Sequence, residues 1–241
     1  MAMIPKIIHY CWFGKGPLPE MAQRCIESWH IFMPDWEYVL WNEDNFAFSS
    51  YPYAQEAYEA KKYAFVSDVA RLFALEQYGG IYLDTDVLVY KSFEPLLEFA
   101  AFAGFEGSKH CPVGTCVIGS ESRGVWVGKQ LADYEGRHFV LPDGGFDLTT
   151  NVSFITGKMK KEGFAANGQE QDFDGIHIFP VDFFCPRHTT GEYIRTENTY
   201  CEHLGIGSWA DARTDWKAKL LSWMSPSLRV LVVKMKRLFF G

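Results

Sequence analysis

The sequence lacks the short motifs that would assign it to several common enzyme classes. It contains no Gly-x-x-x-x-Gly-Lys-Ser/Thr loop, which many nucleotide hydrolases use to hold phosphates, and no Gly-x-Ser-x-Gly elbow, which carries the nucleophile of α/β-hydrolases. None of the six cysteines belongs to a Cys-x-x-Cys pair. Their spacing predicts buried free thiols, and it does not predict a structural zinc site.

Long apolar runs and a secretion signal are absent as well. No stretch of about 20 apolar residues occurs, so we expect no membrane-spanning helix. Residues 1–6 lack the apolar core and the small-residue cleavage site of a signal peptide. These absences favour a cytoplasmic location.

The charge distribution argues against a nucleic-acid-binding protein and distinguishes an acidic main part of the chain from a basic C-terminal segment. The 241 residues carry a net charge of −7, which argues against a general nucleic-acid-binding protein. From Asp215 onward there is no other acid, whereas six basic residues occur: Lys217, Lys219, Arg229, Lys234, Lys236 and Arg237. We expect a domain over residues 1–210 and a basic amphipathic tail over 211–241. The tail either binds the anionic inner face of the plasma membrane or packs on protein.

An apolar content of 48% supports a large core, and the order of strand and helix patterns indicates its architecture. Strands are expected at residues 7–12, 36–41, 81–83 with a continuation at 87–89, 101–105, 115–119 and 176–179. Helices are expected at residues 19–32, 54–78, 125–134 and 152–161. This alternation predicts an α/β fold with a mainly parallel central sheet flanked by helices.

Two aspartates after the third strand form the most informative motif. Gly79 and Gly80 precede the apolar segment 81–83, and Asp84 and Asp86 follow it. Because side chains at i and i+2 of an extended segment share a side, we expect both carboxylates to face one point. Their oxygens suit Mg²⁺ or Mn²⁺ with bound phosphate. The polar surroundings of a second such pair, in residues 172–174, predict a loop.

Several other side chains are candidates for a site around this pair. Asp68 and Arg71 share a face of the preceding helix, either as a solvated ion pair or as ligands for sugar hydroxyls and phosphate. Trp12 ends the first strand, where it either stacks on a base or packs in the core. His203 opens a glycine-containing loop and is either structural or a metal ligand.

Six segments also occur in a recognisable order: 5–14 (PKIIHYCWFG), 27–29 (ESW), 41–42 (WN), 64–71 (AFVSDVAR), 78–86 (YGGIYLDTD) and 208–209 (SW). Together they resemble glycosyltransferase family 32, and the resemblance extends from about Ile4 to Trp209. That family contains bacterial capsular and surface polysaccharide enzymes with an Asp-x-Asp sugar-binding region. It is related to yeast initiating mannosyltransferases and to the glucosyltransferase domains of clostridial toxins.

The resemblance implies a GT-A type fold, a nucleotide-sugar donor, Mn²⁺ or Mg²⁺ as cofactor, and retention of the anomeric configuration. It implies that Trp12 stacks on the base of the donor. Asn42 and Tyr82 would contribute to the donor pocket, and Asp68 and Arg71 would bind the donor sugar and phosphate.

The metal shell implied by the resemblance is centred on the aspartate pair. Asp84 would contact the ribose and sugar, or the metal through water, and Asp86 would ligate the metal directly. His203 or Ser208 would complete the shell, and Trp209 would donate a hydrogen bond to the diphosphate.

Two departures from the family pattern leave details open. Leu204 stands where many relatives have a second histidine, so the last metal ligand is either His203 or Ser208. Residues 112–116 replace the asparagine-containing stretch that would touch the acceptor, so the identity of the acceptor is open.

The implied reaction moves a sugar from a nucleotide-sugar donor to a glycan or lipid-linked acceptor in surface polysaccharide synthesis. Negative charge grows on the departing diphosphate, and the cation, Arg71 and Trp209 would stabilise it. No residue stands out as a nucleophile, so we favour front-face attack by the acceptor hydroxyl. Two alternatives are a phosphatase with an aspartyl nucleophile in segment 83–88 and a non-catalytic nucleotide-sugar-binding module.

Overall fold

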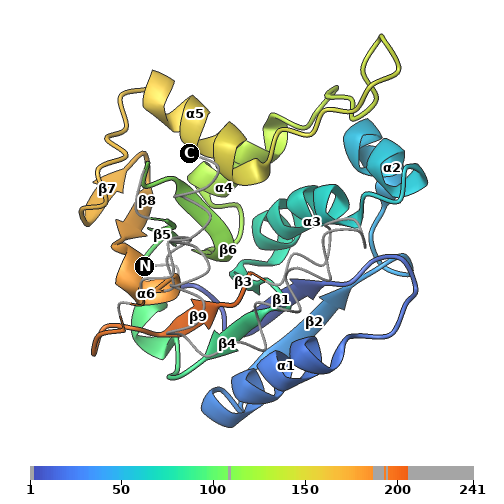
Figure 1. The fold of residues 1–241 in the computed structure, drawn as a ribbon. Coiled ribbons are helices and arrows are strands. Elements are labelled where there is room, and N and C mark those ends of the chain that lie inside the picture. Colours follow the sequence, from blue (N-terminus) through green and yellow to red (C-terminus); the bar gives the residue numbers. More distant parts are fainter. Residues whose placement is uncertain (1–2, 108–109, 187–192, 194, 206–241) are drawn as a thin grey trace, which may run out of the picture.

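A seven-stranded sheet in the order β2-β1-β3-β6-β5-β8-β7 forms the centre of the computed structural model, which describes residues 3–107, 110–186, 193 and 195–205 (Figure 1). A separate two-stranded sheet pairs β4 with β9. The strands are β1 Ile7–Cys11, β2 Glu37–Trp41, β3 Gly80–Leu83, β4 Val87–Val89, β5 Ala101–Phe105, β6 Val113–Ser120, β7 Gln171–Phe173, β8 Ile176–Phe179 and β9 Cys201–His203. The helices are α1 Glu20–Phe32, α2 Pro52–Glu59, α3 Tyr63–Tyr78, α4 Val125–Ala132, α5 Asn151–Lys161 and α6 Val181–Phe184, with short 3₁₀ turns at Phe48–Ser50 and Glu94–Leu96.

The strand directions make the large sheet mainly parallel. β1 is parallel to both β2 and β3, and β5 is parallel to β8. β6 is antiparallel to its neighbours β3 and β5, so these two share the common direction, and β7 runs against β8 at the edge. The predicted fold class, an α/β fold with a mainly parallel central sheet flanked by helices, is therefore confirmed.

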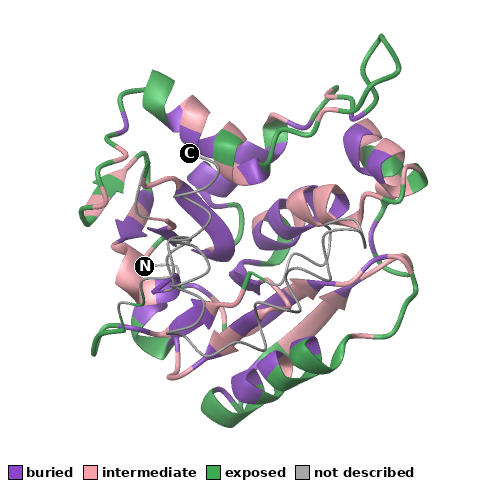
Figure 2. Ribbon diagram, viewed as in Figure 1, coloured by how far each residue is buried: buried purple, intermediate pink, exposed green. Residues whose placement is uncertain are grey.

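Two apolar cores lie on the two faces of this sheet. Helices α3, α4 and α5 cover one face, and α1 lies with the β4–β9 pair on the other (Figure 1). Successive side chains of β3 alternate between the cores, as they must on a pleated strand. Tyr82 joins the α3 side, whereas Ile81 and Leu83 join the core that contains Trp29 of α1. The centre of the sheet is correspondingly buried, and the outer face of α1 is exposed (Figure 2).

The helix expected over residues 54–78 is two helices. α2 ends at Glu59 and α3 begins at Tyr63, and between them Lys61 has a φ of 58°. A left-handed residue cannot continue an α-helix, so the axis changes direction there. The apolar spacing runs through both helices, and it gave no indication of this break.

The continuation predicted for the third strand is also wrong. The backbone N–H of Val87 donates to the Asp84 carbonyl at 3.0 Å, which makes residues 84–87 a turn. After this turn β4 leaves the large sheet and pairs antiparallel with β9, so that Val87 lies opposite His203. The strand change brings His203 to the aspartate pair.

The second aspartate pair does not form the predicted loop throughout. Asp172 lies in β7 and accepts a hydrogen bond from His177 at 2.8 Å, whereas Asp174 has a φ of 48° and forms an ion pair with Lys129. The two carboxylates therefore serve different partners.

Several predictions concern residues that the structure does not describe. Ser208, Trp209 and the tail over 211–241 lie outside the described residues. Within the described residues, every cysteine is a free thiol, as predicted, but Cys111 is half-buried rather than buried. No helix among these residues has the length and apolar character needed to cross a bilayer.

The corner between α3 and β3 depends on two glycines. Gly79 and Gly80 have φ values of 66° and 110°, which glycine adopts without strain. A Cβ on Gly80 would lie 2.6 Å from the carbonyl oxygen of Ile7 in β1. The missing side chain thus lets β3 pair with β1 directly after the helix ends.

Gly80→Ala is expected to lower the free energy of unfolding by about 1–3 kcal/mol, because it adds backbone strain and a clash with β1. Urea unfolding measures this loss. The matched control is Gly157→Ala in α5, where a new Cβ meets no atom within 4 Å. That change is expected to stabilise by up to about 1 kcal/mol through helix propensity. Equal stability of the two variants would contradict the role given to Gly80.

Candidate active site

The ends of β1 and β2 border a pocket of about 490 Å³. Trp12 follows β1 and Asn42 follows β2, and ligands of α/β folds bind at this carboxyl edge of the sheet. The pocket is lined by Trp12, Lys15, Gly16, Leu18, Leu40, Asn42, Glu43 and Asp44. The Trp12 indole N–H donates to the Gly16 carbonyl at 2.7 Å, which fixes the ring at the wall of the pocket. Trp12 is therefore not a core residue.

Asn42 has a local structural role at the same edge. Its side-chain oxygen accepts the backbone N–H of Asp44 at 2.8 Å, which shapes the loop after β2. It also lines the pocket, as the donor-site prediction requires.

A buried guanidinium organises the next part of the site. Arg71 of α3 is 5% exposed and pairs with Asp68 at 2.9 Å and with Asp84 at 3.4 Å. Its Nη1 also donates to the Thr115 carbonyl of β6 at 2.8 Å, and its Nε donates to the Ser67 carbonyl at 3.1 Å. The predicted pair thus joins the buried Arg71 to the half-buried Asp68, and it belongs to a network rather than to the solvated surface.

Tyr82 completes this network from β3. Its hydroxyl donates to Asp84 Oδ1 at 2.8 Å, and its ring lies 4.5 Å from the Arg71 guanidinium carbon. Burial raises the Tyr82 pKa well above its ordinary value, so the hydroxyl remains a neutral donor. Asp84 is therefore held in place by both Tyr82 and Arg71.

Burial also makes the Asp68 carboxylate easier to protonate. It raises the pKa of Asp68 to about 6, although the positive charge of Arg71 opposes this change. Asp84 adds to the increase, because a nearby negative charge disfavours ionisation. This end of the site holds more carboxylates than Arg71 alone compensates.

The aspartate pair and His203 form a group that could hold a metal ion. Ligand atoms of Asp84, Asp86 and His203 all lie within 4.8 Å of one another. Oxygen and imidazole ligands together suit Mn²⁺ as well as harder cations. The two carboxylates converge as predicted, but the reason given for it was wrong, because residues 84–87 are a turn and not an extended strand.

His203 is oriented by Asp86. Its Nε2 lies 3.3 Å from Asp86 Oδ1, and the Leu204 N–H donates to the Asp86 carbonyl at 3.0 Å. Burial would lower the His203 pKa, but its neighbours Cys116 and Asp86 outweigh burial and raise it. Of the two candidates for the last ligand, the structure brings His203 to the pair, and Ser208 is not described.

Asn151 is a candidate that the sequence reasoning missed. This first residue of α5 lies close enough to Asp68 to lower the carboxyl's pKa. Its side-chain amide is buried, yet within the described residues neither Nδ2 nor Oδ1 makes a hydrogen bond of ordinary geometry. A buried amide without partners indicates a place for a polar ligand. An asparagine at a helix start usually suggests capping, so the sequence carried no signal for it.

Comparison with known proteins finds a family model that matches part of the chain. Residues 19–103 match the family model described as "Glycosyltransferase sugar-binding region containing DXD motif". The matched segment includes Asp68, Arg71 and the aspartate pair, so this part of the chain has the sequence pattern of a glycosyltransferase region.

Two yeast relatives share part of the sequence. "Inositol phosphoceramide mannosyltransferase 3" of Schizosaccharomyces pombe is 39% identical over 105 residues, which are 42% of this chain and 29% of that protein. "Mannosyl phosphorylinositol ceramide synthase SUR1" of Saccharomyces cerevisiae is 34% identical over 139 residues, which are 54% of this chain and 34% of that protein. The chain thus spans about a third of the length of these curated relatives. Among solved structures, the PaToxG glycosyltransferase aligns with a TM-score of 0.49 at 19% identity, covering 67% of this chain and 71% of that one.

Arg71→Lys is expected to lower the free energy of unfolding by about 3 kcal/mol. Lysine keeps the charge, but it cannot reach Ser67, Asp68, Thr115 and Asp84 at once, so buried acceptors lose their donors. Thermal or urea unfolding measures the loss. Arg24→Lys on the exposed face of α1 is the control and is expected to change stability by less than about 0.5 kcal/mol. Similar stability of both variants would mean that the network is not structural.

Proposed function

We propose that this protein is a metal-dependent, retaining glycosyltransferase that moves a hexose from a nucleotide-sugar donor to a glycan or lipid-linked acceptor. The observation that carries the proposal is the convergence of Asp84, Asp86 and His203 beside Arg71, which pairs with both Asp68 and Asp84. A pocket borders the carboxyl ends of β1 and β2 in the same sheet. The match to a sugar-binding region over residues 19–103 supports it.

Mannose is the first donor sugar to test. Both yeast relatives are named for mannosyl transfer to inositol phosphoceramide. A lipid with a polar head group is therefore the acceptor class we favour. The expected role in bacterial surface polysaccharide synthesis gains no support from these relatives.

The proposed donor position follows the sheet edge. The base stacks on Trp12 in the pocket, and the sugar lies toward Asp68 and Asn151. The buried amide of Asn151 makes no hydrogen bond of ordinary geometry within the described residues, so it is available to a sugar hydroxyl. Asp86, Asp84 and His203 would hold the divalent cation, which supplies positive charge for the diphosphate leaving group. Arg71 acts mainly by positioning Asp68 and Asp84, because most of its N–H groups already have acceptors.

The chemistry requires no protein nucleophile. Carboxylates at Asp68 and Asp84 can accept hydrogen bonds from sugar hydroxyls and orient the anomeric carbon. The acceptor hydroxyl then attacks from the face that the diphosphate leaves, and its proton passes to the departing phosphate oxygen. This path gives retention of configuration.

Asp86→Asn is expected to reduce nucleoside diphosphate release from GDP-mannose and UDP-hexoses at least about 100-fold at saturating Mn²⁺. Removing a charged metal ligand forfeits several kcal/mol of leaving-group stabilisation. The matched control is Asp172→Asn in the exposed second aspartate pair, which should retain activity within about twofold. Chelation with EDTA should abolish the activity of the parent. If Asp86→Asn releases nucleoside diphosphate at a rate within tenfold of the parent, the metal assignment is wrong. If the parent itself releases none from any donor, the result favours a binding module.

Trp12→Ala is expected to raise the donor KM by roughly 5- to 150-fold with little change in kcat, since base stacking contributes about 1–3 kcal/mol to ground and transition states alike. Trp12→Phe also loses the indole bond to Gly16 but keeps an aromatic face, so its KM should stay near that of the parent. Steady-state kinetics gives the donor KM and the kcat of both variants, either with saturating acceptor or with hydrolysis of the donor as the reaction. A fall in kcat with an unchanged donor KM would mean that Trp12 does not bind the base and acts on a later step of the reaction.

A further inference from the structure

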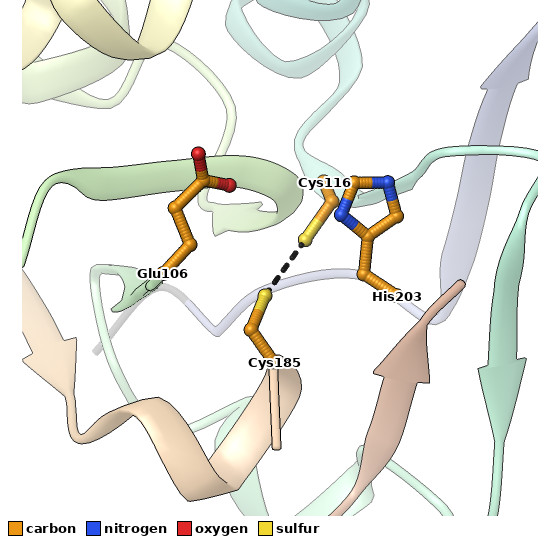
Figure 3. A group of neighbouring side chains, drawn as sticks. All are labelled: Glu106, Cys116, Cys185 and His203. Atoms are coloured by element: carbon orange, nitrogen blue, oxygen red, sulfur yellow. Dashed lines mark hydrogen bonds between the residues drawn. The ribbon is translucent and has the colours of Figure 1, made fainter. Parts of the chain in front are cut away.

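A second cluster of metal-ligating side chains lies next to the aspartate pair. It consists of Glu106, Cys116, Cys185 and His203 (Figure 3). One ligand atom from each of the four lies within 4.8 Å of the others. Two thiols, an imidazole and a carboxylate are a different chemical set from the oxygen-rich pair of aspartates, because sulfur favours soft metals.

Four separate elements build this cluster. Glu106 directly follows β5, Cys116 lies within β6, Cys185 directly follows α6, and His203 ends β9. The long sequence separations explain why the spacing of the cysteines gave no zinc motif. Cys116 is also tied to the proposed active site, because its carbonyl accepts the Asp84 N–H at 2.9 Å.

The two thiols of the cluster are buried and close together. Cys116 is 3% exposed and Cys185 is 5% exposed, and their sulfurs lie 3.4 Å apart (Figure 3). Within the described residues, the half-buried Glu106 carboxylate makes no hydrogen bond or ion pair. A carboxylate that is partly removed from water and has no partner is costly, and a cation beside it would offset that cost.

We propose that Glu106, Cys116, Cys185 and His203 form a binding site for Zn²⁺ or a similarly soft divalent metal. Tetrahedral zinc with two Zn–S bonds of about 2.3 Å separates the sulfurs by roughly 3.8 Å, so a small outward movement of the thiols accommodates the ion. Imidazole and carboxylate ligands then complete four-coordination. Binding releases the two thiol protons to solvent, and a protonated His203 also releases the proton on the ring nitrogen that binds the metal.

The position of His203 links this site to the aspartate pair. Figure 3 shows an imidazole nitrogen of His203 on the side of the Cys116 thiol, whereas Nε2 lies 3.3 Å from Asp86. A metal at the thiols would therefore leave Asp86 as the hydrogen-bond acceptor of the opposite ring nitrogen. Carboxylate–histidine–zinc arrangements of this kind orient metal-bound histidines in many proteins. Zinc would then compete with the cation of the proposed transferase for His203.

Cobalt titration of the reduced full chain tests the site without any assay of transfer. Co²⁺ is expected to bind at one equivalent and to give the near-ultraviolet charge-transfer band of thiolate ligation and the visible bands of tetrahedral coordination. One equivalent of Zn²⁺ should remove these bands, and excess Mg²⁺ should not. Absence of a charge-transfer band would overturn the proposal, whether or not the protein transfers sugar.

Three variants locate the site. Cys116→Ala/Cys185→Ala should lose the charge-transfer band, and Cys111→Ala, which removes a half-buried thiol outside the cluster, should keep it. Glu106→Gln should keep the band and weaken zinc affinity at least about tenfold, and it tests the site even if the double variant fails to fold. The metal binds elsewhere if the charge-transfer band survives in the folded double variant. The same conclusion follows if Glu106→Gln leaves the zinc affinity unchanged.

Discussion

The buried guanidinium of Arg71 is the interaction on which the rest of the site depends. It joins α3 to β6 through Thr115 and to the turn after β3 through Asp84. Without it, the half-buried carboxylates of Asp68 and Asp84 would lose their ion-pair partner at the junction of a helix and the sheet, and leaving a shielded charge unpaired is costly. Because one residue contacts all three elements, the shape of the site and the stability of the fold have a common origin, and changes at Arg71 affect both.

The negative charge that Arg71 leaves uncompensated supports the proposal of a cation at this site. Asp68, Asp84, Asp86 and Glu106 gather within one region, and burial raises the pKa of Asp68 to about 6 and also raises the pKa of Glu106. Raised pKa values of this kind mean that the folded protein disfavours a further negative charge. A diphosphate could therefore bind only together with positive charge, so metal and donor are expected to bind as one unit.

The sequence predicted the architecture better than the details of the site. Apolar patterns located most strands and helices, because burial on two faces of a sheet imposes those patterns directly. They did not reveal the break at Lys61 or the departure of β4 from the large sheet, since both depend on single backbone conformations and on the distant strand β9. The convergence of Asp84 and Asp86 was predicted from strand geometry, although a turn produces it. Asn151 and the cysteine cluster could not be predicted, because only tertiary contacts bring these residues to the aspartates.

The turn that takes the chain from β3 to β4 bears on both proposed metal sites. By pairing β4 with β9, the chain inserts one imidazole between an oxygen ligand set and a sulfur ligand set. A neutral imidazole coordinates one metal at a time while its other nitrogen keeps a proton, so the two sets cannot both use His203. Hard cations have little affinity for the thiols, and they would draw the ring toward Asp86. Soft cations would hold it at Cys116 and Cys185 and leave the aspartates one ligand short. The identity of the available metal would therefore decide which of the two sites is complete.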